Sequence, residues 1–377
     1  MIKKNKKNLT GNIMKNKILL ASGITMLSSS LAIAGGWESS ALSTSFLYEK
    51  GGENGGYGEL AYGSRSYDIT DTATAPNVAS APNSSAVKDQ TSISLSLKYA
   101  VTDEISIGFS RYKQGSIQLD YSGAGSAMAA ALPVVDLTIN ANVLLGKYDI
   151  NDNISVLAGI KQTEVEDATA NIFQSASLPA SSVTGGSELG YVYGAAYSRE
   201  DIALRVELSM ETSTDLSLAT TNAGVGSGNT TASTPDYMNL YVQSGIAEDT
   251  LAFGSIRKAN WSENQIRVYP QATDTSSFSD STTYNIGVGR KFSDNFSGSI
   301  SYSTEPEGSA ASTSHLTITN GYQGITIGGK YTMDNMSITA GYNYTQLGDV
   351  NLTSALGTSN FKDNTVTGFG VRVGYNF

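Results

Sequence analysis

The sequence has no cysteine, one histidine and few charged residues, and each shortage excludes a class of protein. With no Cys among 377 residues there is no disulfide framework, no thiolate metal site and no cysteine nucleophile. A single His leaves too little for a multi-histidine metal site or a histidine relay. Charged residues make up 15% of the chain, whereas soluble domains usually carry about 25%. The composition therefore argues against most classes of enzyme and predicts a surface short of charge.

Long apolar runs and a basic face are also missing. After the first 34 residues no segment approaches 18 consecutive apolar residues, which excludes a transmembrane helix there. The net charge is −10, a poor match for nucleic acid, whose binding proteins need basic faces. A role in a membrane would have to be carried by strands.

Residues 1–34 have the composition of a targeting segment. They contain six lysines and no acidic residue, then a short apolar stretch broken by Ser and Gly, and they end in Ala32-Ile33-Ala34. This order predicts a secretory signal peptide cleaved after Ala34, because a membrane anchor would need about 20 apolar residues. Met14 is an alternative start. Cleavage removes the six lysines and changes the net charge from −10 to −16.

The rest of the chain alternates apolar with polar or small residues at a period of two. In 91–101, five apolar side chains fall on one face and Ser or Lys residues on the other, and the segments 202–210 and 336–345 repeat the pattern. Strict alternation predicts strands with one apolar and one wet face.

Six short turns with Asp, Asn or Glu separate these strands, and they recur at spacings of 49, 48, 48, 46 and 40 residues. Asp and Asn favour tight turns because they tolerate a left-handed backbone and bond their own main chain. The turns are centred at 103, 152, 200, 248, 294 and 334. Each joins two strands, and with the segments 57–68 and 365–377 they predict fourteen strands.

Between the short turns lie long segments rich in Ser, Thr, Ala, Gly and Asn. They are near 70–90, 113–136, 164–187, 214–235, 263–281, 304–320 and 347–361. One end of the sheet thus has short turns and the other has long loops, as in transmembrane barrels of the bacterial outer membrane. A soluble sandwich or a secreted adhesin would also alternate, but it has no reason to segregate its loop lengths.

Aromatic residues support the barrel. An aromatic side chain precedes five of the short turns, where an interfacial girdle belongs; these are Tyr99, Tyr148, Tyr197, Phe292 and Tyr331. The last strand alternates and ends in Phe377, which resembles the signal read by the outer-membrane barrel-assembly machinery. We therefore predict an all-β, transmembrane, antiparallel barrel of about 14 strands over 57–377, preceded by a short N-terminal plug segment over 35–56.

Alternation also predicts which polar side chains face the lumen. They are Lys98, Arg205, Glu207, Glu211, Asn239, Tyr241, Gln243, Thr326, Lys330, Asn343 and Arg372. Such residues generally pair with one another and hold water, and Arg205 and Glu207 can pair along one strand. An Arg that instead faces a bound carboxylate would make a bidentate, charge-assisted contact. Arg205, Arg372 and Lys330 are the candidates for contact with an acidic head group.

Two long loops carry apolar residues. The stretch 124–135 has no charge, and 172–178 contains a second apolar patch. Exposed apolar patches mark binding grooves or contacts with lipid, and the alternative is a loop packed inward. The candidate capture groove consists of Met128, Leu132, Val134, Ile172, Phe173 and Leu178.

His315, in a Ser/Thr-rich loop, is read as a solvated side chain and not as a catalytic one, and no Gly-rich phosphate loop is present.

Several phrases resemble the FadL/TodX-type outer-membrane transporters of long-chain fatty acids and other hydrophobic compounds. They are LAYG at 60–63, KYDINDN at 147–153, IALRV at 202–206, GIAEDTLAFGSIR at 245–257, WSE at 261–263, YNIGVGRKF at 284–292 and GKYTMDN at 329–335. The resemblance implies a monomeric fourteen-stranded barrel, an N-terminal hatch and an apolar capture groove among extracellular loops. It further implies a lumen site and an exit by hatch movement or through a kinked strand. The segment 35–56 is short for that hatch and lacks the family's Asn-Pro-Ala phrase.

The expected function is passive uptake of long-chain fatty acids or other hydrophobic compounds across the bacterial outer membrane, with no catalysis and no cofactor. The expected partners are these compounds, outer-membrane lipid and the barrel-assembly machinery, and not nucleic acid. A general or substrate-selective porin for small polar solutes is the alternative, and a surface adhesin or structural barrel is a third class.

Overall fold

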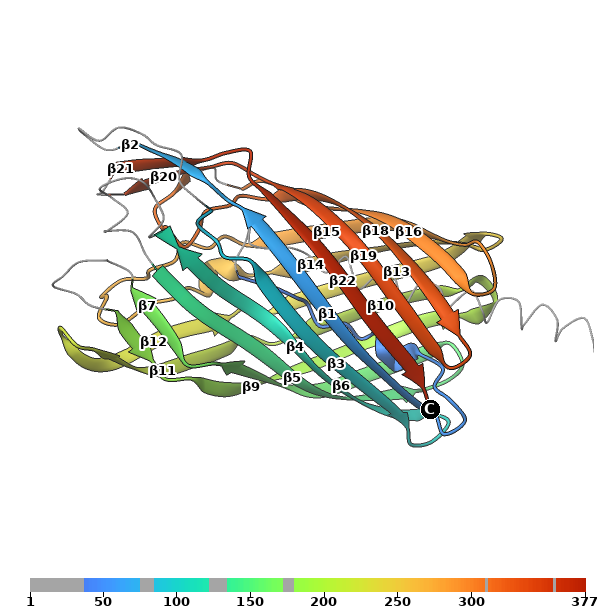
Figure 1. Ribbon diagram of the computed structural model, residues 1–377. Coiled ribbons are helices and arrows are strands. Elements are labelled where there is room, and N and C mark those ends of the chain that lie inside the picture. Colours follow the sequence, from blue (N-terminus) through green and yellow to red (C-terminus); the bar gives the residue numbers. More distant parts are fainter. Residues whose placement is uncertain (1–36, 75–84, 122–133, 172–179, 309–310, 355–356) are drawn as a thin grey trace, which may run out of the picture.

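A computed structural model of the chain describes residues 37–74, 85–121, 134–171, 180–308, 311–354 and 357–377. Fourteen long antiparallel strands run obliquely around a barrel (Figure 1). In chain order they are β1 (Gly56–Asp68), β3 (Gln90–Ala100), β4 (Ile105–Asp120), β5 (Val134–Asp149), β6 (Ile154–Val165), β9 (Gly186–Arg199), β10 (Leu204–Glu211), β13 (Tyr237–Ala247), β14 (Thr250–Ala259), β15 (Ser281–Lys291), β16 (Phe296–Glu305), β18 (Tyr322–Met333), β19 (Met336–Leu347) and β22 (Thr365–Asn376).

The first and last strands close the ring. β1 pairs with β3 on one side and with β22 on the other, in a register that runs from Tyr57↔Asn376 to Asp68↔Thr365. Closure gives every barrel strand two neighbours, so no barrel strand is left as an open edge along its whole length. The predicted all-β antiparallel barrel of fourteen strands is confirmed.

The six short turns lie where the acidic and amide residues predict them. In three turns a side chain accepts a hydrogen bond from the amide of the first residue of the next strand. Asn151 Oδ1 accepts from Ile154 at 2.9 Å, Thr102 Oγ1 from Ile105 at 3.0 Å and Ser293 Oγ from Phe296 at 3.1 Å. Asp249 and Asp334 adopt positive φ angles of 53° and 44°, a conformation that Asp tolerates better than most residues.

The two faces of the barrel wall invert the burial usual in a soluble protein. Large apolar side chains point outward and stay exposed, with Ile93 and Ile286 both 67% and Leu60 56% accessible. Serines, threonines and charged side chains of the same strands are buried on the inner face. An apolar exterior around a polar interior is the pattern of a barrel that meets lipid.

The long-loop end contains an aromatic-rich core of buried side chains, here called the cap cluster. Among its buried members, Trp261 and Phe278 lie with ring centroids 5.5 Å apart, and Tyr237 and Trp261 at 6.4 Å. Eight short strands and a 3₁₀ turn, η6 (Trp261–Glu263), belong to this end. The strands are β2 (Asp71–Thr74), β7 (Ala168–Asn171), β8 (Ser181–Val183), β11 (Thr214–Asn222), β12 (Gly226–Thr234), β17 (Ala311–Ser312), β20 (Val350–Ser354) and β21 (Gly357–Phe361).

Here the structure differs from the sequence-based expectation, because the long segment near 214–235 is a hairpin of β11 and β12. It forms because Leu216 and Leu218 are buried in a cluster with Val165 and Val183 of neighbouring strands. Its Ser, Thr and Gly content alone would fit a loop.

Candidate functional site

Residues 37–55 run through the inside of the barrel from the long-loop end to the short-turn end. At the long-loop end Trp37 belongs to the cap cluster, with its ring centroid 5.3 Å from that of Phe278. At the other end Gly55 donates from its amide to Gly52, and Gly52 to Gly56, beside the chain terminus Phe377. The lumen therefore contains a segment of the chain itself, which we call the lumen segment.

The part of the lumen segment nearer the long-loop end, here called its upper part, forms backbone hydrogen bonds with the barrel sheet. The amide of Ser39 donates to the carbonyl of Gln114 on β4 at 2.7 Å, and the amide of Ser116 donates to the carbonyl of Trp37 at 3.2 Å. Arg65 of β1 donates to the Ser39 carbonyl at 2.6 Å. These bonds hold the segment against β4 through one isolated antiparallel bridge, Glu38↔Gly115.

The lower part is a 3₁₀ turn, η2 (Ser45–Tyr48), packed on the inner wall. Phe46 and Leu47 are fully buried, and they fill the space that a side chain on Gly108 of β4 would need. The Lys98 Nζ donates to the carbonyl of Glu49 at 2.6 Å, so the lower end is also held by a wall cation.

A cavity of about 230 Å³ lies beside the lumen segment. Its walls combine the segment itself with β1, β3, β4, β10 and β13–β16, and residues with hydroxyl or amide side chains are the most numerous among them. The hydroxyl and amide side chains are Ser40, Ser43, Thr44, Ser45, Ser92, Ser94, Ser96, Ser110, Ser209, Asn239, Ser255, Thr283, Asn285 and Ser303. Such a lining offers many hydrogen-bond donors and acceptors to a bound molecule or to water.

The barrel wall opens between β3 and β4 next to this cavity. Within the described residues the two strands pair only from Ala100↔Ser106 to Leu95↔Arg111, and contact resumes higher up where Lys88 donates to Gln118 at 3.0 Å. The outward-facing Ile93 is among the residues that line the cavity. We call this interruption the β3–β4 window. The lumen segment covers it from inside, because Ser39 bonds to β4 where β3 does not.

Arg205 lies on the inner face of β10, 5% exposed, and lines the cavity. Its guanidinium is 4.2 Å from the ring centroid of Tyr48 in the lumen segment and 4.8 Å from that of Tyr241 on β13. Glu207 instead accepts a hydrogen bond from Thr44 Oγ1. The structure thus places Arg205 against aromatic rings, and Glu207 against the lumen segment.

Arg372 and Lys330 also lie inside, toward the short-turn end, and both are buried. The Arg372 Nη1 is 3.6 Å from Glu59 Oε2, which accepts a hydrogen bond from Tyr57 at 2.8 Å. The terminal nitrogens of Arg372 have no hydrogen-bond partner among the described residues. The three predicted head-group residues are therefore in the lumen. Arg205 lies against aromatic rings, whereas Arg372 lies near Glu59 and within electrostatic range of Lys330.

Most of the predicted capture groove lies outside the described residues, namely Met128, Leu132, Ile172, Phe173 and Leu178. Val134 is the first residue of β5 and is half-buried. The apolar side chains that the described residues gather at this end are the buried ones of the cap cluster.

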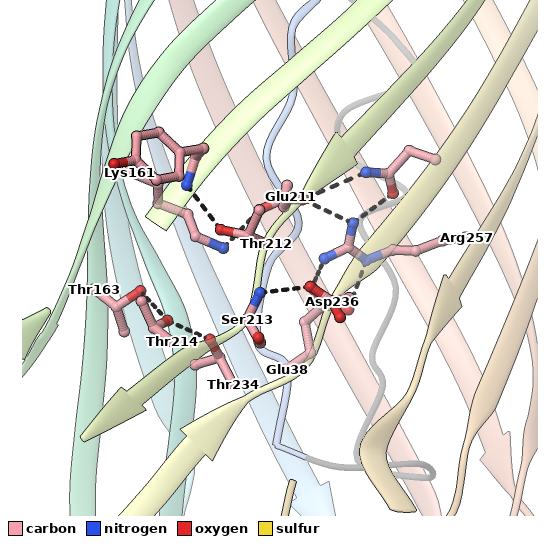
Figure 2. A network of polar contacts seen from close by, with 12 residues as sticks. Glu38, Lys161, Thr163, Glu211, Thr212, Ser213, Thr214, Thr234, Asp236 and Arg257 are labelled. Atoms are coloured by element: carbon pink, nitrogen blue, oxygen red, sulfur yellow. Dashed lines mark hydrogen bonds and ion pairs between the residues drawn. The ribbon is translucent and has the colours of Figure 1, made fainter. Parts of the chain in front are cut away.

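Four buried charged residues form a network that the sequence analysis does not assemble (Figure 2). Arg257 of β14 binds both carboxylate oxygens of Glu38, with Nε to Oε2 at 2.9 Å, and donates to Glu211 of β10 at 3.1 Å. Lys161 of β6 donates to the other Glu211 oxygen at 3.0 Å. Alternation could have placed Arg257 inward, since it shares a face with Ser255. Nothing in the sequence near Glu38 points to a partner 219 residues away.

His315 lies in the loop between β16 and β18 with its ring centroid 5.8 Å from that of Tyr121. Burial lowers the pKa of His315 to about 4, against a weaker opposing influence of Asp71. It is therefore a packed, neutral side chain at neutral pH and not the solvated one expected.

No set of His, Cys, Asp and Glu side chains in the described ranges could hold a metal ion. None of the helices among those residues has the length and apolar character needed to cross a membrane.

No protein-family model matches the sequence, and no curated protein matches it significantly. Solved structures match the fold instead. A Pseudomonas aeruginosa FadL homologue superimposes with a TM-score of 0.70 at 12% identity, covering 88% of this chain and 92% of that one. The chain has the fold of the FadL and TodX channels. The Pseudomonas putida toluene transporter TodX gives a TM-score of 0.60 at 14% identity over 92% and 96% of the two chains. The monoaromatic hydrocarbon channel CymD gives 0.54 at 12% identity over 88% and 90%. The resemblance noted in the sequence is thus confirmed in three dimensions.

Proposed function

We propose that this chain is a bacterial outer-membrane channel for the passive uptake of hydrophobic compounds, long-chain fatty acids among them. The observation that carries the proposal is the combination of a lumen occupied by residues 37–55 with a wall interrupted at the β3–β4 window beside a cavity. An occupied lumen resists the free passage of water and ions, while a side window lets an apolar molecule leave into lipid. The fold likeness to a FadL homologue and to hydrocarbon channels supports this choice.

The proposed route has three stages. Cargo is collected at the long-loop end, which we place outside the cell, by loop residues that include Met128, Leu132, Val134, Ile172, Phe173 and Leu178. It then enters the cavity beside the lumen segment. Movement of that segment uncovers the β3–β4 window, and the cargo passes sideways into the membrane. No catalytic step or cofactor belongs to this proposal.

An acidic head group would meet cations on the way. Arg205 lines the cavity, and a hydrogen bond to a charged group contributes about 1.5–3 kcal/mol. Arg372 and Lys330 also lie on the inner face toward the short-turn end and are proposed as further contacts. A contact between a carboxylate and a buried cation is electrostatically stronger than the same contact in water.

For targeting and assembly we propose what the sequence predicts. We propose that residues 1–34 are removed after Ala34, that 35–56 act as the hatch, and that the barrel is a monomer. Phe377 at the short-turn end is proposed as the signal for the assembly machinery.

Single-channel conductance of the refolded barrel, together with binding of a labelled long-chain fatty acid, tests the function. We expect a silent or flickering barrel that binds the fatty acid. A Ser94→Trp substitution, which fills the cavity beside the window, should reduce uptake of the fatty acid, whereas Ser227→Trp in the β11–β12 hairpin should not. Large, steady conductance that is independent of cargo contradicts the proposal.

The second candidate is a porin selective for small polar solutes, and the hydroxyl lining of the cavity favours it. It predicts steady ion conductance and permeation of small sugars or amino acids without fatty-acid binding. The same recordings therefore separate the two functions.

A further inference from the structure

The carboxylate of Glu38 sits in a recognition site built by the barrel wall. Arg257 presents Nε and a terminal nitrogen to the two Glu38 oxygens, the side-on geometry with which arginine binds carboxylates. The side chains are 3% and 9% exposed, so the pair is desolvated. Only the carboxylate comes from the lumen segment, and the guanidinium belongs to the wall.

The wall residues alone leave this site one negative charge short. Lys161 and Arg257 are cationic and only Glu211 between them is anionic, as Figure 2 shows. The Tyr237 ring lies 3.8 Å from the Arg257 guanidinium and shields it from water without neutralising it. Glu38 supplies the missing negative charge. Without Glu38 the wall would hold an incompletely paired buried cation, which is costly unless another anion replaces it.

Trp37, the residue before Glu38, occupies an apolar pocket next to the carboxylate site. Trp37 inserts an apolar ring into the cap cluster against Phe278, and its Nε1 is buried without a hydrogen-bond partner among the described residues. A buried indole N–H usually finds a partner, so this pocket suits a fully apolar group better than it suits Trp. Trp37 and Glu38 together therefore present an apolar body and a carboxylate to a matching pocket.

The same site is reachable by cargo. Arg257 and the adjoining segment residues Ser40 and Ala41 line the 230 Å³ cavity. A carboxylate entering there can exchange with Glu38 on Arg257. One carboxylate replaces another on Arg257, so the free energy of the ion pair changes little. Burial of the ligand's apolar tail therefore decides whether the cargo displaces Glu38.

We infer that Trp37 and Glu38 occupy the binding site of a hydrophobic monocarboxylate and act as an internal competitor that the cargo displaces. This inference rests on the proposed function and narrows its substrate class. Displacement would also detach Ser39 from β4 and uncover the β3–β4 window, which couples recognition of the carboxylate to opening.

Tryptophan fluorescence tests the inference directly, because the chain has only two tryptophans, and both lie in the cap cluster. A Trp261→Phe background leaves Trp37 as the only reporter. The purified full-length barrel is titrated with dodecanoate and, separately, with dodecan-1-ol, which has the same chain but no charge. We expect dodecanoate to shift Trp37 emission to the red and dodecanol to shift it far less.

Glu38→Gln should tighten dodecanoate binding by roughly tenfold or more, because the competing carboxylate is gone. Glu164→Gln is the matched control: Glu164 also pairs with an arginine, Arg111 at 3.4 Å, but both side chains are exposed. The dodecanoate affinity of this variant should equal that of the wild type. Arg257→Gln should abolish the difference between the two ligands. If that variant does not fold, Glu38→Gln alone still decides.

Equal responses to both ligands, together with an unchanged dodecanoate affinity in Glu38→Gln, would overturn the inference and leave hydrophobic uptake standing. Binding of neither ligand by any folded variant would instead overturn the proposed function itself, and the inference with it.

Discussion

The guanidinium of Arg205 lies 4.2 Å from the centre of the Tyr48 ring, so a cation of the barrel wall stacks on an aromatic side chain of the lumen segment. Desolvated contacts of this kind contribute about 2 kcal/mol, and exposed ones about 0.5–1 kcal/mol. The contact fixes the lower half of the segment, as the Glu38–Arg257 pair fixes the upper half.

Tyr48→Ala should loosen the lower half of the lumen segment. Loss of roughly 1–2 kcal/mol corresponds to an increase of about 5- to 30-fold in the population of conducting states. Single-channel recording measures this as more frequent openings. Tyr48→Phe is the control, because it keeps the ring and removes only a hydroxyl without a hydrogen-bond partner among the described residues. A silent Tyr48→Ala barrel would contradict a role for this contact in holding the segment.

Charge reversal at Arg205 should discriminate between cargoes. Arg205→Glu repels an acidic head group but not a hydrocarbon, so uptake of a fatty acid should fall by about tenfold or more and uptake of an alkane by less than about twofold. Fatty-acid uptake by Arg205→Lys should lie between that of the wild type and that of Arg205→Glu, since lysine keeps the charge and loses the planar guanidinium. Competitive uptake of the two labelled compounds measures the ratio. Equal losses for both would remove Arg205 from head-group recognition.

The packing of His315 predicts a pH dependence at the long-loop end. Its pKa is lowered from 6.5 to about 4, so the packed loop prefers the neutral ring and the unpacked loop takes up a proton more readily. The stabilisation is therefore fully present above about pH 6.5 and is lost as the pH falls toward 4, with a maximum on the order of 3 kcal/mol. Because the chain has one histidine, an imidazole NMR titration reports it without assignment. A midpoint near 6.5 would show that the ring is not packed.

The close packing of the lumen segment against Phe377 depends on Gly52. A Cβ there would lie 2.6 Å from backbone atoms of Phe377, so Gly52→Ala must displace the terminus. We expect a loss of about 1–3 kcal/mol, the usual cost of overpacking, seen as a lower unfolding temperature in detergent. Gly289→Ala on β15 is the control, since its nearest neighbours would be 3.8 Å away. Equal unfolding temperatures for the two variants would rule out a close fit at Phe377.

The barrel could be predicted from the sequence because its two determinants are local. Alternation sets which face of a strand is apolar, and turns such as Asn151–Asn153 bond their own backbone. The β11–β12 hairpin was missed although Leu216 and Leu218 alternate with polar residues, because the Ser- and Gly-rich β12 carries no such signal of its own. It becomes a strand only through pairing with β11.

The candidate site was less predictable because it depends on which distant residues meet. Alternation indicates an inward Arg205, but not that Tyr48 would cover it. The partner of Arg257 is 219 positions away on a segment whose path is fixed only once the barrel exists around it. Residues that line a lumen can thus be predicted strand by strand, whereas contacts with a segment threaded through it cannot.

The amide of Ser116 shows what the β3–β4 window implies for hydrogen exchange. In a closed barrel, wall amides are protected by the neighbouring strand and exchange only when the wall itself breathes. Ser116 donates instead to the carbonyl of Trp37, so its proton is retained by a segment that is not part of the wall. The exchange rate of the Ser116 amide therefore reports how often the lumen segment detaches from β4, independently of the stability of the barrel around it.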